Sequence, residues 1–420
     1  MEVTAGRSER HAKLRPWQHG MIFLLACVVI ILRRPDAIFH AQLYAEDGHV
    51  WFADAYNLGW WHALFQAHTG YYQTLPRLGA SLALLVPFAL APLVLNLIAI
   101  AVMAMPVNIL LSSRSAAWGS LRSRALLASV YLVLPNCAEI SNGITESQWL
   151  LALSTFLVLT ASTPRNIAGR VFDLSAVLLC GLTGPFCILL LPLATVFAWK
   201  HRSRWRWVVT GILAVLCLIQ IWALLVVDPA GRTSTVTGAS PALLARILGG
   251  QVYLATLLGA NGLATRSGLI VLFCCIAVGG TAFVAIHFAT GSLARKLFLL
   301  FSVMLFAVSL ISPTGSIPGG LPSWISLAAA AAVRYWFFPS LAFAWSLIWC
   351  SSQPSRALRI VPTSLLCLMC FGIVRDWRHP PLQDMHFAEH AHRFASAPAG
   401  ETITIPLNPN GWNMQLVKHE

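Results

Sequence analysis

Long apolar runs separated by short basic clusters recur along the whole chain. Runs such as residues 207–227 and 269–289 are long enough to cross a bilayer core, which takes about 20 helical residues. Hydrophobic residues make up 57% of the 420-residue sequence, and its mean hydropathy is +0.71. A soluble core of this size could not bury so much apolar surface. The sequence therefore predicts a membrane protein most of whose surface faces lipid.

The positive charge of the chain fits a membrane protein better than a nucleic-acid-binding protein. The formal net charge is +13, but the basic residues fall in short clusters between apolar runs rather than on one polar face. Such clusters orient membrane helices, because Lys and Arg stay on the cytoplasmic side. Four basic residues between Arg7 and Arg15 precede the first apolar run. We therefore expect a cytoplasmic N-terminus and no nucleic-acid partner.

The first apolar run is expected to remain as an anchor. Residues 17–32 are followed by Arg33, Arg34 and Pro35 rather than by a small-residue cleavage pattern, so no cleavable signal is indicated. All ten cysteines lie inside or at the edge of apolar runs, and the long polar loops have none. A disulfide framework is therefore not expected.

Alternating the basic clusters between the two sides of a membrane gives about eleven crossings. Residues 77–111 count as one crossing. Pro87, Pro92 and Pro106 interrupt them, so we expect a short tilted or half-inserted helix to about Leu90, followed by the true span. The predicted spans are 17–32, 77–111, 125–137, 147–162, 171–183, 186–199, 207–227, 269–289, 297–312, 336–350 and 358–375.

The predicted fold class is all-α, a polytopic membrane helical bundle of about 11 transmembrane helices with exterior interfacial helices. The bundle covers residues 1–375, with an exterior loop at 33–76. In the exterior loop 228–268, leucine and isoleucine residues at 243–248 have helical spacing, which is typical of an amphipathic interfacial helix. Residues 376–420 form a short exterior C-terminal tail, expected to fold back on the exterior loops as a lid or acceptor platform. Within it, residues alternate as in a strand up to Ile405, and Pro406 and Pro409 are expected to end that strand.

Acidic residues concentrate in the predicted exterior segments. Of the 15 acidic residues, all but Glu2, Glu9 and Asp173 fall there. The densest stretch is 44–79, which also contains tryptophan and tyrosine residues, and such rings favour the membrane boundary. Ionisable groups near hydrocarbon cost roughly 2.5–3.5 kcal/mol each, so a cluster of them indicates a polar cavity and usually a function. We interpret this stretch as a catalytic loop.

Glu46 and Asp47 are the main candidates in this loop. Adjacent residues leave a helix about 100° apart, so only one can point fully into a given site. Asp47 is favoured, because Asp54 is seven residues on and shares its helical face, together with Trp51. The alternative is that both acids simply favour the first turn of an interfacial helix through its dipole.

Motifs of several enzyme classes are missing from the sequence. It contains no GxxxxGK, GxGxxG after a strand, HExxH or GxSxG pattern. These motifs are the strongest sequence evidence for nucleotide hydrolysis, dinucleotide redox chemistry, zincin proteolysis and serine hydrolysis, so none of these functions is indicated. Two other patterns have simple explanations. The histidines at 386, 390 and 392 suit a solvated helix better than a metal site. Cys367 and Cys370 have redox spacing but are expected to pack in the core.

An acidic pair just past the first membrane helix, followed by aromatics and by Pro76–Arg77 at the start of the second, resembles the GT-C superfamily of polytopic glycosyltransferases. Members of that superfamily use polyprenyl-phosphate-linked sugars. The segments Leu182–Phe186 and Arg334–Trp336 are similar to those of a bacterial subgroup. The resemblance implies a transferase of the bacterial inner (plasma) membrane. It would move a sugar from a polyprenyl-phosphate donor to a cell-envelope glycan or lipid acceptor at the exterior, periplasmic face.

Sugar transfer from a lipid phosphate assigns roles to charged residues. An acceptor hydroxyl attacks the anomeric carbon, and a carboxylate can accept its proton; Asp47, beside Glu46, is the predicted base. The departing phosphate needs a cation, and a guanidinium forks onto phosphate oxygens well. Arg334 is the first candidate and Arg77 the second. Both sit at the exterior start of an apolar helix, and the alternative for each is an interfacial anchor.

Further substrate-binding candidates lie in other exterior segments. Glu139 and Glu146 could bind acceptor hydroxyls or complete a metal site with Asp47, or form only a solvated turn. Tyr335, with Trp336, could stack on sugar faces or belong to the aromatic belt. His49 of the acidic loop completes the set. We assign no metal ligands, although a divalent cation stays possible as a cofactor.

Two other function classes compete with the enzyme. A transporter or flippase of a lipid-linked saccharide would suit the helix breaks at Pro87, Pro92 and Gly184–Pro185, but the sequence has no two-fold repeat and its ionisable residues cluster on one face. A noncatalytic assembly subunit would tolerate replacement of Asp47.

Overall fold

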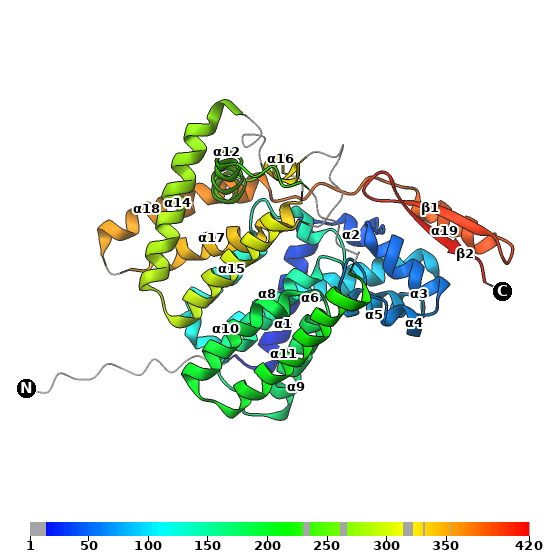
Figure 1. The fold of residues 1–420 in the computed structure, drawn as a ribbon, viewed down its shortest axis with the longest axis horizontal. Helices are drawn as coiled ribbons and strands as arrows, with labels where there is room; N and C mark the ends of the chain where they lie inside the picture. Colours follow the sequence, from blue (N-terminus) through cyan, green and yellow to red (C-terminus); the bar gives the residue numbers. More distant parts are fainter. Residues whose placement is uncertain are drawn as a thin grey trace, which may run out of the picture.

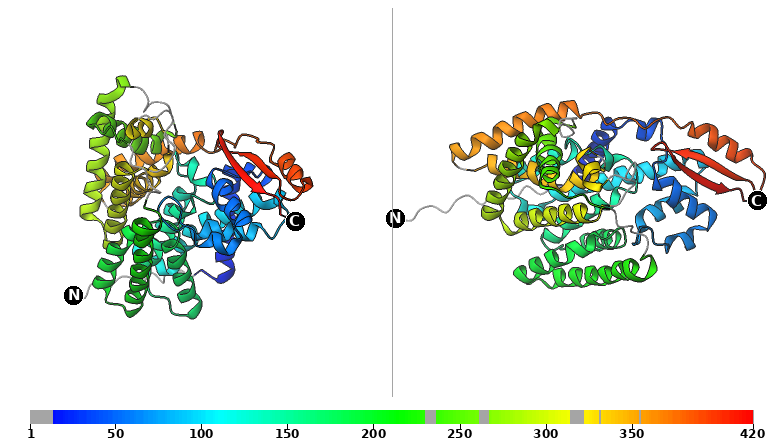
Figure 2. Two further views of the ribbon diagram at one scale, coloured as in Figure 1. Left: turned by 45° about the vertical axis from the view of Figure 1, so that its right-hand side comes forward. Right: turned by 45° about the horizontal axis from the view of Figure 1, so that its top comes forward.

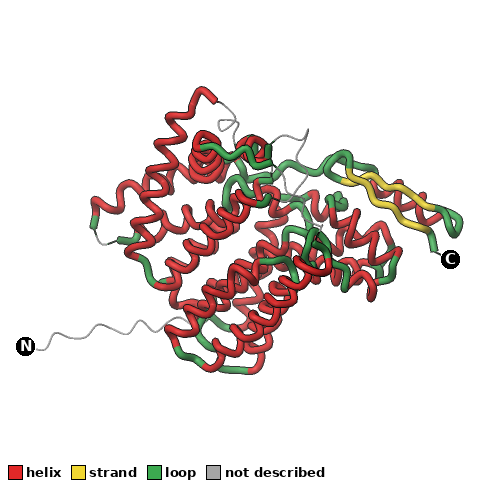
Figure 3. Tube along the Cα trace, in the orientation of Figure 1, coloured by secondary structure: helices red, strands yellow, loops and turns green. Residues whose placement is uncertain are grey.

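The protein is a helical bundle with one small sheet at one end (Figures 1 and 3). The computed structural model describes residues 14–229, 236–260, 267–313, 322–330, 332–353 and 355–419. The longer helices are α1 (Pro16–Arg33), α5 (Thr74–Ala83), α6 (Ala91–Leu111), α7 (Leu121–Leu132), α8 (Ser147–Thr160), α9 (Ile167–Gly181), α10 (Phe186–His201), α11 (Arg204–Trp222), α14 (Ile270–Thr290), α15 (Leu293–Ile311), α17 (Phe337–Ser351), α18 (Arg356–Arg375) and α19 (Phe387–Ser396).

Short helices connect the longer ones. They are α2 (Asp36–Phe39), α3 (Ala53–Asn57), α4 (Trp60–Leu64), α12 (Pro241–Ala245), α13 (Ala255–Leu258) and α16 (Ser323–Ala328), with tighter or wider turns η1 (Asp47–Phe52), η2 (Phe88–Leu90), η3 (Ser113–Trp118), η4 (Ala138–Ser141), η5 (Ala223–Val227), η6 (Arg246–Leu254), η8 (Ser267–Leu269) and η10 (Val333–Trp336). The strands β1 (Thr402–Leu407) and β2 (Trp412–Val417) form an antiparallel hairpin. The all-α prediction missed this sheet.

Each of the eleven predicted spans contains a helix, but not all of these helices are long enough to cross a membrane on their own. Within the described ranges, six helices have the length and apolarity to do so. They are Pro16–Arg33, Phe88–Leu111, Arg204–Val227, Pro241–Leu258, Ile270–Thr290 and Leu293–Ile311. Helices α8 and α10 are apolar but shorter. The count of eleven crossings therefore stays a prediction.

The break predicted within residues 77–111 is present. The short helix α5 ends at Ala83, and α6 begins at Ala91 after the turn η2, which follows Pro87. Proline has no backbone N–H and disfavours helix in the residue before it, which explains why the helix does not continue. The two helices pack against each other, so α5 and its loop stay next to the start of α6.

The predicted interfacial helix corresponds to α12, η6 and α13, which together run from Pro241 to Leu258. Figure 1 shows α12 end-on, whereas α14 beside it lies across the view. The segment packs on α14 through η6. The composition of the segment would also suit a membrane span. Its direction differs from that of α14, which favours the predicted interfacial helix.

Segments predicted to be exterior contact one another at one end of the bundle. The side chain of Asp228 accepts a hydrogen bond from the backbone of Gly70 (2.9 Å). Asp376 accepts one from the backbone of Asn136 (2.9 Å), and Thr74 N donates to Leu182 O (2.9 Å). These contacts join loops far apart in sequence into one polar face, which we call the acidic face because it carries most of the carboxylates.

Segments predicted to be cytoplasmic meet at the opposite end. Arg114 forms an ion pair with Asp173 (2.7 Å), and Arg206 donates to the carbonyl of Ala161 (3.1 Å). Thr163 and Ser203 share a hydrogen bond of 3.0 Å between their hydroxyls. We call this the basic face. The separation of the two faces agrees with the predicted arrangement of loops.

The C-terminal tail folds back on the acidic loop, as expected. Figure 2 shows α19 and the hairpin on the same side of the bundle as α2 to α5. The backbone N–H of Ala45 donates to the carbonyl of Asn408, and the hairpin packs on η1 and α3. Pro406 was expected to end the strand, but it lies within β1 and a second strand follows.

The cysteine predictions had mixed outcomes. All ten cysteines are free thiols, which confirms that no disulfide framework exists. Cys367 and Cys370 are exposed on α18, so the expectation that they pack in the core was wrong. Their part of α18 is apolar on its outer surface as well, because residues such as Leu368 and Phe371 are also exposed. Periodicity cannot identify the inner face of a helix that is apolar all round.

Candidate functional site

Asp47 anchors the acidic loop to the turn before α8. It is 2% exposed and begins the π-helix η1. Its Oδ2 accepts a hydrogen bond from the backbone of Ile144 (3.0 Å), and its Oδ1 accepts two from Thr145, from the backbone (3.1 Å) and the hydroxyl (2.6 Å). Gly143 makes room for this carboxylate, because a Cβ there would collide with Oδ2. Asp47 thus holds residues 143–145 in place.

Burial controls the protonation of Asp47. Removing a carboxylate from water disfavours its charged form. Burial therefore raises the pKa of Asp47 to about 7, although the hydrogen bonds from Thr145 and Ile144 oppose the shift. Both oxygens already have partners. The geometry suits a residue that positions a loop better than one that meets a substrate.

The side chains of Asp47, Trp51 and Asp54 do not share one face of an α-helix, contrary to the prediction. The wider turns of η1 change the spacing, and Asp54 instead pairs with Arg77 (3.0 Å). The guanidinium of Arg77 also lies over the ring of Trp51, 5.0 Å from its centroid. Trp51 donates to the Thr145 hydroxyl (2.8 Å). Arg77 is therefore part of the support of the loop rather than an exposed cation.

Arg334 lies between the carboxylates of two other segments. Its backbone N–H donates to Glu139 Oε2 (2.9 Å), and its guanidinium forms a short ion pair with Glu139 Oε1. The same guanidinium nitrogen is 3.8 Å from Glu146 Oε1. Burial lowers the pKa of Arg334, but the charges of Glu146 and Glu139 outweigh it, so the pKa lies above its ordinary value. The predicted residues Glu139, Glu146 and Arg334 are thus brought together.

One carboxylate oxygen of Glu146 has no hydrogen-bond partner among the described residues. Glu146 is 5% exposed at the start of α8, and its unpartnered oxygen, Oε2, is buried. Burial raises its pKa to about 8; Arg334 opposes this shift, while the negative charges of Glu139 and Glu46 add to it. An unpaired buried acceptor is costly, so it is well suited to take a hydrogen bond from a ligand.

Glu46 completes the cluster from the acidic loop. Its charge acts on Glu146, on Arg334 and on His68, so its carboxylate lies within electrostatic reach of all three. It is partly exposed, and no other described residue gives it a hydrogen bond or ion pair. Of the adjacent acids, Glu46 is therefore the one that a substrate could approach, whereas the sequence favoured Asp47.

The structure adds residues that were not predicted. Arg34 is buried and donates to Ser141 O (2.7 Å) and to Asn142 Oδ1. Burial and the charge of Glu139 raise the pKa of Tyr44. Arg34 and Asp47 therefore fix the two halves of the segment that carries Glu139 and Glu146. A signal existed, because a basic pair at a predicted exterior end departs from the positive-inside rule.

Two predicted substrate-binding residues have structural contacts instead. His49 lies against the tail: its Nδ1 is 2.6 Å from Asn413 O, and its ring meets Trp412 edge-on at 5.5 Å. Tyr335 is buried and packs edge-on against Trp149 at 5.8 Å. Its ring is therefore not presented to a ligand as a stacking surface.

No metal site emerges from the described residues. They contain no group of three or more His, Cys, Asp or Glu side chains that could hold a metal ion. His386, His390 and His392 are at the start of or on α19, where His386 lies 3.5 Å from Glu389 on the exposed surface. The interpretation of α19 as a solvated helix agrees with this exposure.

Solved structures that are similar to the chain include two oligosaccharyltransferases. One is the archaeal oligosaccharyltransferase AglB from Archaeoglobus fulgidus in complex with an inhibitory peptide and a dolichol-phosphate, with a TM-score of 0.45 and 10% identity. The other is an oligosaccharyltransferase from the same organism tethered to an acceptor peptide containing the NVT sequon, with a TM-score of 0.45 and 12% identity. Each comparison covers 91% of this chain and 58% of the other chain, so this chain spans less than two thirds of their length.

Comparison of the sequence alone gave no relatives. Neither the protein-family models nor the curated proteins matched it. Both of the solved structures named above are oligosaccharyltransferases.

Proposed function

We propose that the protein is a membrane glycosyltransferase that moves a sugar from a polyprenyl-phosphate donor to a cell-envelope glycan or lipid acceptor. The observation that carries this proposal is the cluster of Glu46, Glu139, Glu146 and Arg334 at one end of an apolar bundle. The cluster combines an accessible carboxylate, an unpaired buried acceptor and a guanidinium. In sugar transfer from a lipid phosphate, these groups can serve as base, as ligand of a sugar hydroxyl and as ligand of the phosphate.

Glu46 is the base in this proposal. The acceptor hydroxyl attacks the anomeric carbon, its proton passes to the carboxylate of Glu46, and the bond to the phosphate oxygen breaks. Asp47 is the second member of the catalytic pair and acts by positioning. It fixes the turn before Glu146 through its bonds to Ile144 and Thr145, so that the carboxylates on the two segments stay at a constant separation.

Arg334 stabilises the leaving phosphate, and Glu146 orients a sugar. The planar guanidinium of Arg334 matches the geometry of phosphate oxygens and can bind two of them at once. The unpaired Oε2 of Glu146 is suited to accept a hydrogen bond from a sugar hydroxyl. Arg77 keeps only a supporting role, because it is paired with Asp54 beneath Trp51.

We place the reaction at the exterior face of a bacterial inner membrane, with the N-terminus in the cytoplasm. This orientation is supported by the basic face, where Arg and Lys residues gather as they do on cytoplasmic ends of membrane helices. A lipid phosphate at the membrane boundary would then lie level with Arg334, which precedes the apolar helix α17.

The test is transfer in liposomes that contain the purified protein and a polyprenyl-phosphate donor with a labelled sugar. We expect label to leave the prenol and appear on added envelope acceptor. Arg334→Lys should weaken donor binding about tenfold, because the lysine keeps the charge but loses the fork. Label that crosses the membrane still attached to the prenol would instead support a flippase. Label that neither moves nor transfers would fit an assembly subunit.

A further inference from the structure

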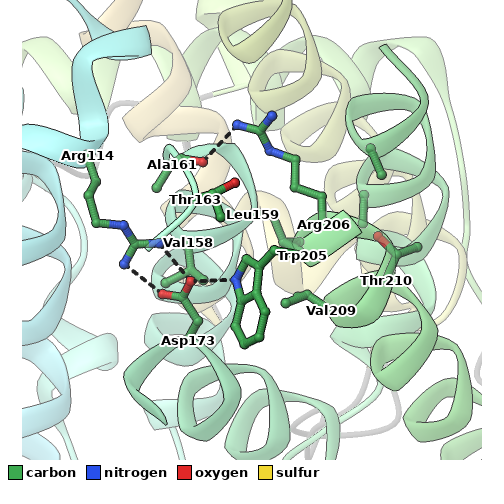
Figure 4. Close-up of a pocket in the computed structure, with 12 residues that line it drawn as sticks. Arg114, Val158, Leu159, Ala161, Thr163, Asp173, Trp205, Arg206, Val209 and Thr210 are labelled. Atoms are coloured by element: carbon green, nitrogen blue, oxygen red, sulfur yellow. Dashed lines mark hydrogen bonds and ion pairs between the residues drawn. The ribbon is translucent and has the colours of Figure 1, made fainter. Parts of the chain in front are cut away.

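The basic face contains a pocket that the proposed reaction does not use. Figure 4 shows it between the end of α8, α9 and the start of α11. About 320 Å³ of space free of protein atoms lies in and above it, and this volume includes open solvent. Its inner part is tight, so a ligand group would sit at the mouth. The mouth carries Arg206 and Thr163, and Val158, Ala194 and Val209 are among the apolar residues that line it.

The single acid of this pocket is already neutralised. Asp173 is buried, and both of its oxygens bind the guanidinium of Arg114 (2.8 and 2.7 Å). The indole of Trp205 donates to it as well (3.2 Å). Figure 4 shows the three side chains converging. Because Arg114 also donates to Ser162 O (2.8 Å), Arg114 and Asp173 form a closed pair that leaves no net charge in the wall.

Arg206 is the cation that remains available. One of its terminal nitrogens donates to Ala161 O (3.1 Å), and its guanidinium lies 4.8 Å from the ring centroid of Phe197. Its Nε–H is buried and has no acceptor among the described residues. The hydroxyls of Thr163 and Ser203 lie on the loops beside it. A guanidinium with an unused donor next to hydroxyls is a typical receptor for a phosphate oxygen.

The surroundings have the charge and polarity of a lipid headgroup site. Five exposed cations lie in, or within a few residues of, the two loops that border the pocket, and they are Arg165, Arg170, Lys200, Arg202 and Arg204. Large apolar side chains are exposed directly beside them on α10 and α11, among them Trp199 and Trp207. A phosphate held at the mouth would therefore have its acyl chains along an apolar surface. Basic pockets between membrane helices commonly bind anionic headgroups.

We propose that this pocket binds the phosphate of an anionic phospholipid of the leaflet at the basic face, with Arg206 as its main ligand. The lipid would hold the turn 162–166 against the start of α11. This inference is independent of the reaction proposed for the acidic face, since no residue is shared between the two sites.

Native mass spectrometry of the delipidated full chain in detergent tests the site. We expect the first phosphatidylglycerol to bind at least tenfold more tightly than phosphatidylcholine. Arg206→Gln should weaken phosphatidylglycerol binding about tenfold, the loss expected for one charge-assisted hydrogen bond. The control Arg356→Gln removes an exposed cation at the start of α18 and should change binding less than twofold.

Several results would overturn the proposal. One is equal affinity for the two lipids, and another is an equal loss in Arg206→Gln and Arg356→Gln, which would mean that only the overall positive charge attracts lipid. Displacement of phosphatidylglycerol by excess inorganic phosphate would indicate a free-phosphate site instead. If Arg206→Gln does not fold, Arg206→Lys decides the matter: it should bind phosphatidylglycerol more weakly than the wild type, and unchanged binding would contradict the assignment.

Discussion

At the scale of single residues, the two adjacent acids Glu46 and Asp47 have different environments. Asp47 is enclosed by the turn before α8 and accepts three hydrogen bonds from it. Glu46 is partly exposed beside Glu146 and Arg334. Asp47 therefore supports the structure of the site, whereas its neighbour Glu46 can contact a substrate.

Asp47→Asn tests this separation. The amide keeps the size of the side chain but offers an N–H to the donors Ile144 and Thr145, so at least one buried hydrogen bond is lost. We expect the free energy of unfolding to fall by about 1–3 kcal/mol, seen as a lower melting temperature, together with reduced transfer. Asp384→Asn, on the exposed surface, is the matched control and should change little. Full stability with no transfer would return the role of base to Asp47.

Glu146 should make stability depend on pH. An ordinary glutamate loses its proton near pH 4.5, whereas burial raises the pKa of Glu146 to about 8. Between these values the folded chain holds one proton more than the unfolded chain, so stability falls as pH rises through this range. Asp47, with its pKa raised to about 7, acts in the same direction.

The measurement is the melting temperature of wild type and Glu146→Gln at pH 5 and pH 8. We expect the melting temperature of the wild type to fall more from pH 5 to pH 8 than that of Glu146→Gln, because glutamine has no proton to release. Equal losses in both proteins would show that Glu146 ionises in the folded state as it does in the unfolded one.

The chemistry of these residues was predictable from the sequence, but their contacts were not. An acidic pair after the first apolar run marked the loop, and Glu139, Glu146 and Arg334 were each predicted as substrate-binding residues from their exterior positions. The helical face that favoured Asp47 over Glu46 assumed an α-helix with 100° per residue. The segment is a π-helix, and such wider turns have no sequence signature that could be recognised in a single chain.

At the scale of elements, the C-terminal hairpin is a clamp on the acidic loop. Leu407 is buried against Gly48, where an added Cβ would lie 2.8 Å from the leucine Cδ1. Next to it, Asn408 accepts the backbone hydrogen bond of Ala45, whose φ is +44°. The hairpin therefore braces the strained residue that directly precedes Glu46.

Leu407→Ala should loosen this clamp. Truncation of a buried leucine typically lowers the free energy of unfolding by about 2–5 kcal/mol. We therefore expect the C-terminal tail to unfold at a clearly lower temperature. Transfer should fall as well, because the loop before Glu46 loses its brace. Thr404→Ala alters an exposed side chain of the same strand and is the control. Normal transfer by a Leu407→Ala protein whose tail has melted would show that the hairpin does not position the loop.

The sequence predicted that the tail returns to the loops but could not predict the hairpin. Alternation up to Ile405 indicated a strand, and two prolines argued that it ended there. In the structure Pro406 pairs with Asn413 within the ladder. The missing N–H at this position is tolerated because the sheet has only two strands, so a residue can direct its N–H away from its single neighbour.

At the scale of the whole molecule, charge is divided between two faces. The acidic face gathers the carboxylates and the unpaired acceptor of Glu146, and the basic face holds the pocket of Arg206. The positive-inside rule predicted the members of both groups of loops. It could not give the number of crossings, because helices such as α7 and α9 are shorter than a bilayer core and depend on their neighbours for burial.

The central claim is that Glu46 accepts the proton of the acceptor during sugar transfer. It is tested by the rate of transfer from a labelled polyprenyl-phosphate sugar in liposomes, compared between wild type, Glu46→Gln and Glu389→Gln. Glu389 is an exposed acid of α19, with 81% of its side chain accessible, and serves as the matched control.

Loss of a general base should slow transfer by about 10²–10⁴-fold, so we predict this loss for Glu46→Gln, with unchanged donor binding and a normal melting temperature. Glu389→Gln should transfer at the wild-type rate. A Glu46→Gln protein that transfers sugar as fast as the wild type would contradict the account.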